Sequence, residues 1–142
     1  MTGVQTCALP ICHSADVLPL MGTTRHMVIA ATDKEANDLA RKAYSRWYQS
    51  FMYLWDKHGT KPGAYFPSTW DELAGAGRAL AGTPETVREQ LLHQIDVSGI
   101  NFVLTRFAFG DLPFEHSKRS VSLFASDVMP WILERTDALQ PH

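Results

Sequence analysis

The sequence has little of what disulfide scaffolds, zinc sites and nucleic-acid interfaces require. Among its 142 residues only Cys7 and Cys12 are cysteines, too few for a disulfide framework or a structural zinc site. Its 13 basic residues are scattered and are outnumbered by 15 acidic ones, so the formal net charge is −2. Proteins that bind nucleic acid usually carry a basic patch. We therefore expect no nucleic-acid partner.

Signals of membrane insertion, metal binding and hydrolysis are also missing. The mostly apolar stretch 7–12 is interrupted by Pro10 and follows no Lys or Arg, so it fits neither a membrane span nor a signal peptide. The 6 histidines have no neighbouring carboxylate motif, and no Gly-x-Ser-x-Gly nucleophile turn occurs. We expect no membrane contact, no metal site and a cytoplasmic location.

Residues 1–12 follow neither the period of a strand nor that of a helix. They are similar to a translated sequencing-adapter stretch, and the alternative is a genuine disordered tail. In either case we expect no function in them. The adapter interpretation further implies that protein upstream of residue 13 is missing.

The first expected elements are a strand over 25–31 and a long helix. The strand is short and mostly apolar, as in buried parallel sheets. Thr32 and Glu35 fit a capping box, which begins the helix. Apolar residues then recur at helical spacing, and Gly59 can adopt the left-handed conformation that ends a helix.

A second strand and helix are expected after a long connection over 60–77, which has room for one short helical turn around 68–74. The strand is brief and covers 78–81. Thr83 as N-cap and Pro84 at the first helical position begin the helix, and Gly99 ends it.

The third strand, over 101–108, is rich in β-branched and aromatic residues. A last helix begins near Pro113, and Pro130 should kink or restart it because proline has no backbone N–H to donate. The expected apolar face of this helix comprises Val121, Phe124, Ala125, Val128 and Ile132.

Strands and helices therefore alternate, which predicts an α/β fold with about three βα units and parallel strands. Three strands cannot close a barrel, and a parallel sheet of three leaves edges unpaired. The pattern therefore argues for partners that are not part of this chain.

Gly82 and Thr83 form the first candidate site. They join the end of the second strand to a helix N-terminus, where backbone amides and the helix dipole favour an anion such as a cofactor phosphate. The alternative is that Thr83 is only a helix cap.

The second candidate site follows the third strand and consists of Arg106, Phe107, Phe109 and Asp111. In a barrel this segment would lie at the substrate mouth. If the strand continues, both rings lie on one side of it and Arg106 on the other. The alternative is that the rings only pack in the core and that Asp111 is an N-cap.

Four stretches carry a resemblance to a known family: 82–91 (GTPETVREQL), 98–103 (SGINFV), 107–112 (FAFGDL) and 122–130 (SLFASDVMP). They resemble the last two βα units of the bacterial luciferase-like flavin-dependent monooxygenases. The stretch 25–36 resembles the strand and helix that come before these units. The resemblance as a whole runs from about residue 18 to about residue 132.

The resemblance implies that residues 13–142 are the C-terminal part of a TIM-type (β/α)₈ barrel. The implied parent enzyme oxidises a small organic substrate with O₂ and reduced FMN, which a flavin reductase supplies, or it uses the deazaflavin F420. Related barrels are often homo-oligomers. No catalytic residue can be assigned, because the strands that supply most flavin contacts in this family are absent, and we expect the fragment itself to be inactive.

Two alternatives remain beside this interpretation. One is a non-catalytic α/β module whose exposed sheet edges are covered by self-association. The other is a compact flavodoxin-like domain, which requires a phosphate loop after its first strand. The stretch 31–35 has neither the glycines nor the cluster of hydroxyl groups for such a loop.

Overall fold

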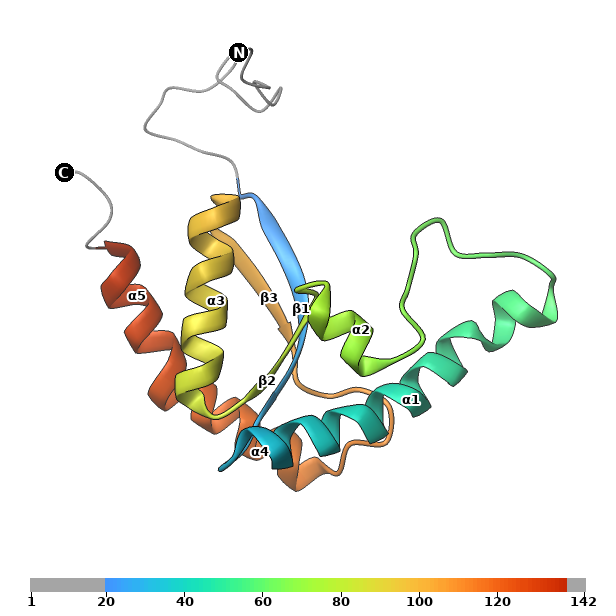
Figure 1. Cartoon of the computed structure of the whole chain (residues 1–142), viewed down its shortest axis with the longest axis horizontal. Coiled ribbons are helices and arrows are strands. Elements are labelled where there is room, and N and C mark those ends of the chain that lie inside the picture. Colours follow the sequence, from blue (N-terminus) through green and yellow to red (C-terminus); the bar gives the residue numbers. More distant parts are fainter. Residues whose placement is uncertain (1–19, 138–142) are drawn as a thin grey trace, which may run out of the picture.

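The computed structural model describes residues 20–137, so the predictions for residues 1–12 lie outside it. The elements, in chain order, are β1 (Gly22–Ile29), α1 (Asp33–Lys57), α2 (Trp70–Gly75), β2 (Ala79–Gly82), α3 (Pro84–Ser98), β3 (Phe102–Arg106), α4 (Phe114–Leu123), a π-helical turn η1 (Phe124–Val128) and α5 (Met129–Asp137) (Figure 1). Every expected element is confirmed, with boundaries shifted by a few residues.

The predicted helix caps are also present. The Thr32 hydroxyl accepts a hydrogen bond from the Glu35 amide, and the Thr83 hydroxyl accepts one from the Thr86 amide. Gly59 and Gly99 end α1 and α3 with positive φ angles of 63° and 65°. These caps satisfy backbone groups that would otherwise lack partners at the helix ends.

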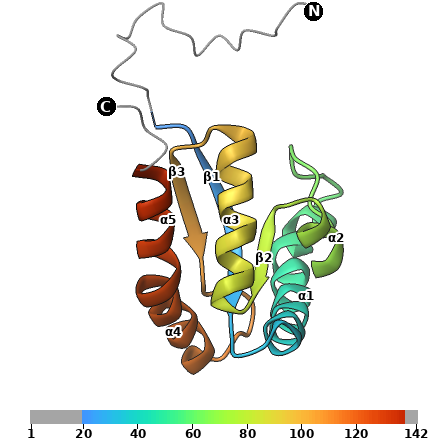
Figure 2. The same cartoon turned by 60° about the vertical axis from the view of Figure 1, so that its left-hand side comes forward.

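The three strands form one parallel sheet in the order β2-β1-β3, so the strand that comes first in the sequence lies in the centre (Figure 2). His26 of β1 is level with Ala79 of β2 and with Arg106 of β3. Successive strands of a (β/α)₈ barrel lie in sequence order, which would place β2 between the other two. The parallel α/β sheet is thus confirmed, and its order is the one that begins a doubly wound sheet.

This order explains why helices cover both faces of the sheet. Crossovers between parallel strands are almost always right-handed, so moving from β1 to β2 and from β2 across to β3 puts the connecting helices on opposite faces. Figure 1 shows α1 and α2 on one side of the strands and α3 and α5 on the other.

Each face of the sheet has its own hydrophobic core, because alternate residues of a strand point to opposite faces. Val28 and Ala30 pack with α1 and α2, and Met27 and Ile29 pack with α3, η1 and α5. All four side chains are at most 1% exposed. β1 is therefore the buried centre of the fold.

Pro130 restarts the last helix, as expected. Just before it, residues 124–128 form a π-helical turn, a wider turn that takes in an extra residue. The predicted apolar face is only partly correct. Val128 and Ile132 are buried, but Val121 and Ala125 are exposed, because α4 turns Ser117 and Ser120 toward the sheet instead.

Candidate functional site

The most distinctive group of side chains surrounds His26, in the middle of β1. The imidazole is 6% exposed and meets the rings of Tyr44, Trp47 and Phe109 edge-on, with centroids 5.8, 4.9 and 4.7 Å away. Edge-on contact places the positive edge of one ring against the electron-rich face of another. We call His26, Tyr44, Trp47, Phe109 and Arg106 the His26 cluster.

Arg106 completes the cluster at the end of β3. Its Nη1 lies 3.2 Å from Nε2 of His26, the ring nitrogen on the side of β3. A guanidinium group has no acceptor, so Nε2 must accept this bond and the ring is neutral. Burial lowers the pKa of His26 to about 4, and the positive charges of Arg106 and Arg78 add to the effect.

The aromatic surface extends from the cluster along α1. The ring of Trp47 stacks on that of Phe51 at 4.9 Å with an angle of 10° between them, and Phe66 lies 4.8 Å from Phe51. The guanidinium carbon of Arg78 lies 5.2 Å from the centre of the Phe66 ring. A cation over an aromatic face at this distance is a favourable contact. The rings therefore form a row from His26 through Trp47 and Phe51 to Phe66. Arg106 contacts the His26 end and Arg78 the Phe66 end.

The arginines around the sheet have no acidic partner among the described residues. All five ion pairs found there involve other cations, on α1, α3 and α4. Arg106 bonds to neutral His26, Arg78 to the carbonyl oxygen of Tyr65, and Arg25 to the side chain of Gln94. This region therefore carries a positive charge that the described part of the chain does not neutralise.

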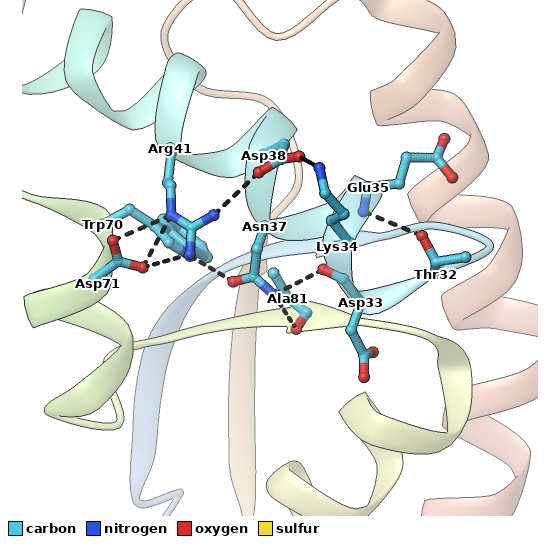
Figure 3. Close-up of polar contacts among 10 residues, drawn as sticks. All are labelled: Thr32, Asp33, Lys34, Glu35, Asn37, Asp38, Arg41, Trp70, Asp71 and Ala81. Atoms are coloured by element: carbon cyan, nitrogen blue, oxygen red, sulfur yellow. Dashed lines mark hydrogen bonds and ion pairs between the residues drawn. The ribbon is translucent and has the colours of Figure 1, made fainter.

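A polar network holds α1, α2 and β2 together behind the cluster (Figure 3). The side-chain amide of Asn37 accepts from the Trp70 indole at 3.0 Å and donates to the carbonyl oxygens of Asp33 at 2.8 Å and Ala81 at 3.4 Å. The Trp70 ring in turn lies parallel to that of Phe109, 6.1 Å away. The network thus fixes one wall of the cluster.

Arg106 and Phe109, two of the expected substrate-mouth residues, do come together, but Phe107 does not join them. Phe107 packs on the opposite face, where its ring is 5.4 Å from Phe124. The prediction that both rings lie on one side is wrong, because β3 ends at Arg106 and the strand alternation stops there.

Asp111 is exposed, takes part in none of the ion pairs among residues 20–137, and is not an N-cap. Pro113 holds the N-cap position of α4, which has no side-chain cap bond. Gly110 allows the segment to pass close to α1, since it has a φ of 59° and a Cβ there would lie 1.9 Å from the Ala43 carbonyl oxygen. Only glycine fits this position.

The Gly82–Thr83 turn is already occupied by an acid from this chain. The Asp33 carboxylate accepts from the Thr83 amide at 2.8 Å, and a Cβ on Gly82 would lie 2.6 Å from the same oxygen. Pro84 has no amide proton, and the Thr86 amide is bound by the Thr83 hydroxyl. A phosphate here would have to displace Asp33, so the turn as folded does not fit one. Cofactor binding at these residues stays a prediction.

Neither His26 nor Trp47 is among the site residues expected from the sequence. Histidines draw attention as metal ligands, and no group of three or more His, Cys, Asp or Glu side chains in residues 20–137 is placed to hold a metal. The feature that identifies this site is the register of β1 with β3, because it places His26 beside Arg106. Within the same residues, no helix is both long and apolar enough to cross a bilayer.

Comparisons with known proteins show a shared fold. A scan against known protein families finds no match. A protein of Sinorhizobium fredii described as "Uncharacterized protein y4wF" is 32% identical over 109 residues, which cover 77% of this chain and 32% of that protein. The crystal structure of the monooxygenase RslO1 from Streptomyces bottropensis matches with a TM-score of 0.63 and 22% identity, over 78% of this chain and 30% of RslO1. The chain thus spans about a third of the length of each relative, and it has the mixed α/β fold of the corresponding part of RslO1.

Proposed function

We propose that this chain is the C-terminal part of a longer flavin-dependent monooxygenase of the luciferase-like family. The longer enzyme oxidises a small organic substrate with O₂ and reduced FMN, and a separate reductase supplies the reduced flavin. The observation that supports this most is the similarity to the monooxygenase RslO1 over 78% of the chain. The motif resemblance between residues 82 and 130 is the second support.

The described residues supply an apolar wall and a cation, and their Gly82–Thr83 turn as folded has no room for a flavin phosphate. The one turn expected to hold a phosphate is filled by Asp33. When bound, reduced flavin supplies the electrons that activate O₂, and water must be kept from it. We therefore assign the flavin contacts to the rest of the longer protein, and to this part a stretch of substrate-facing surface that includes the His26 cluster.

The sheet order sets a condition on this proposal. In a closed (β/α)₈ barrel β2 would lie between β1 and β3, whereas here β1 is central. We therefore propose the family and its chemistry with the strand order found here, and not a closed barrel order for these three strands. The remaining strands of the longer protein would cover the sheet edges that are open here.

Two measurements test the proposed function. The first is the DNA sequence upstream of codon 13, where we expect roughly 200 further codons of alternating strand and helix in frame. The second is oxygen consumption by the protein encoded by that longer frame, with reduced FMN, compared with residues 13–142 alone. We expect activity only from the longer protein. A stop codon directly upstream, or sub-micromolar FMN binding by residues 13–142, would contradict the proposal.

A second candidate is a non-catalytic module that associates with itself. Phe102 and Leu104 on β3 are 45% and 53% exposed, and large apolar side chains on an open sheet face favour association. Sedimentation of the purified chain separates the two functions. A discrete dimer that dissociates when Leu104 is replaced by Ser would favour the module.

A further inference from the structure

The face of the sheet that holds the His26 cluster continues onto β3 and is open there. Arg106 is level with His26, so Leu104 and Phe102, two and four residues earlier in the strand, share its face. Helix α1 packs on β1 and β2, while Phe102 and Leu104 on β3 are 45% and 53% exposed. The open surface is therefore an apolar floor that ends at the guanidinium group of Arg106, and Trp47 contacts the same His26 ring to which Arg106 bonds.

Arg106 is well placed to take an acidic ligand. It is exposed, and its bond to His26 uses one of the five N–H donors of a guanidinium group. The ring it contacts is neutral, and no carboxylate of residues 20–137 pairs with it. A carboxylate would gain two parallel, charge-assisted hydrogen bonds from such a group.

The side chains near Arg106 favour a ligand whose carboxylate is attached to a flat, apolar ring. Trp47 stacks on Phe51, and its ring is only partly buried. Leu104 offers apolar contact from the strand side. Aromatic rings stack well on such surfaces and lose little conformational freedom on binding.

We propose that this surface binds an aromatic carboxylate, with the acid group on Arg106 and the ring between Trp47 and Leu104. The inference deepens the proposed function by naming the substrate class of the longer enzyme. The surface itself lies wholly within this chain, so its binding can be measured without flavin.

The test is isothermal titration of the full chain with 2-naphthoate and with 2-naphthamide, which has the same ring and no charge. We expect the acid to bind about tenfold more tightly, the difference that one charge-assisted contact commonly makes. Cyclohexanecarboxylate and inorganic phosphate serve as further probes, and both should bind more weakly than 2-naphthoate. Equal affinity for acid and amide, or tighter binding of either further probe, would overturn the proposal.

Variants locate the site. Arg106→Gln should remove the preference for the acid, and Arg106→Lys should keep part of it, because lysine retains the charge without the two-pronged geometry. Arg135→Gln removes the same charge from an exposed position on α5 and should change nothing. Thermal melting of each variant verifies that it is folded. An Arg106→Gln protein that is folded and still prefers the acid would place the site elsewhere.

The outcomes also separate this inference from the proposed function. If 2-naphthoate binds as expected but the longer protein consumes no oxygen with reduced FMN, the binding site stands and the proposed function fails. If the longer enzyme is active while acid and amide bind equally well, the substrate class is wrong and the function stands.

Discussion

A single hydroxyl group, that of Ser120 on α4, bonds both backbone groups of Ile29 at the end of β1. It accepts from the Ile29 amide at 3.0 Å and donates to the Ile29 carbonyl oxygen at 3.1 Å. β3 ends level with His26, so beyond that point β1 has no strand on this side. Ser120, which is fully buried, takes the place of the missing strand.

Replacing Ser120 with Ala should destabilise the fold by about 2 to 6 kcal/mol, because two buried backbone groups would lose their partner at about 1 to 3 kcal/mol each. Urea unfolding monitored by circular dichroism measures the loss. Ser122→Ala, on an exposed position of the same helix, is the matched control and should lie within about 0.5 kcal/mol of the parent. Equal stability of the two variants would show that Ile29 finds other partners.

The stability of the fold should fall as the pH is lowered from 7.5 toward 4. The folded pKa of His26 is about 4, below its ordinary value of 6.5. Between pH 6.5 and 4 the unfolded chain binds a proton at His26 and the folded chain does not. The free energy of unfolding therefore falls by up to about 3 kcal/mol. The other ionisable groups around the ring are Tyr44, whose pKa is raised to about 12 by burial, and the cations Arg78 and Arg106.

Urea unfolding at several pH values tests this, together with NMR titration of the His26 ring. A His26→Gln variant should lose most of the pH dependence between 4 and 6.5. The matching His93→Gln variant loses an exposed histidine and should retain the pH dependence of stability. A His26 ring that titrates near 6.5 in the folded protein would contradict the expectation.

Two glycines with almost the same φ should respond differently to alanine. At Gly110 a Cβ would lie 1.9 Å from the Ala43 carbonyl oxygen, whereas at Gly59 nothing lies within 4 Å of it. Gly59→Ala should cost about 1 kcal/mol for the left-handed backbone alone. Gly110→Ala must also push the 107–112 segment away from α1, so we expect about 3 kcal/mol or more. Similar losses for the two variants would mean that this segment shifts freely.

The strand order can be tested with cysteine pairs in a background in which Cys7 and Cys12 are replaced by Ser. Thr24 and Leu104 are direct neighbours on β1 and β3, so Thr24→Cys with Leu104→Cys should form a disulfide on mild oxidation. Ala79→Cys with Arg106→Cys spans two strand spacings and should stay reduced. Mass spectrometry after thiol labelling distinguishes the states. The reverse result would mean that β2 already lies beside β3, as in a barrel.

Local features of the fold follow well from the sequence, because their causes are local. The hydroxyl caps Thr32 and Thr83 and the end glycines Gly59 and Gly99 set the helix boundaries. The interruption at Pro130 follows from the missing amide proton of proline. Each of these needs only a few neighbouring residues.

The order of the strands and the composition of the site depend on contacts between distant residues. Nothing near His26 in the sequence shows that Arg106, 80 positions later, will bond to its ring. The separation of Phe107 from Phe109 likewise depends on where β3 stops, which hydrophobic periodicity leaves undefined by a few residues. The burial of Ser117 and Ser120 also escapes a pattern based on apolar residues, and Ser120 is held in place by its bonds to Ile29 of β1.

The central place of β1 has a consequence for the order of events on the ribosome. β1 is synthesised first, yet one of its two neighbours is completed only at Arg106. At about 5 to 20 residues per second, the 80 residues between His26 and Arg106 take roughly 4 to 16 seconds to make. During this time the edge of β1 that later pairs with β3, residues 22–26, stays open, so chaperone binding to the nascent chain should be strongest before β3 emerges.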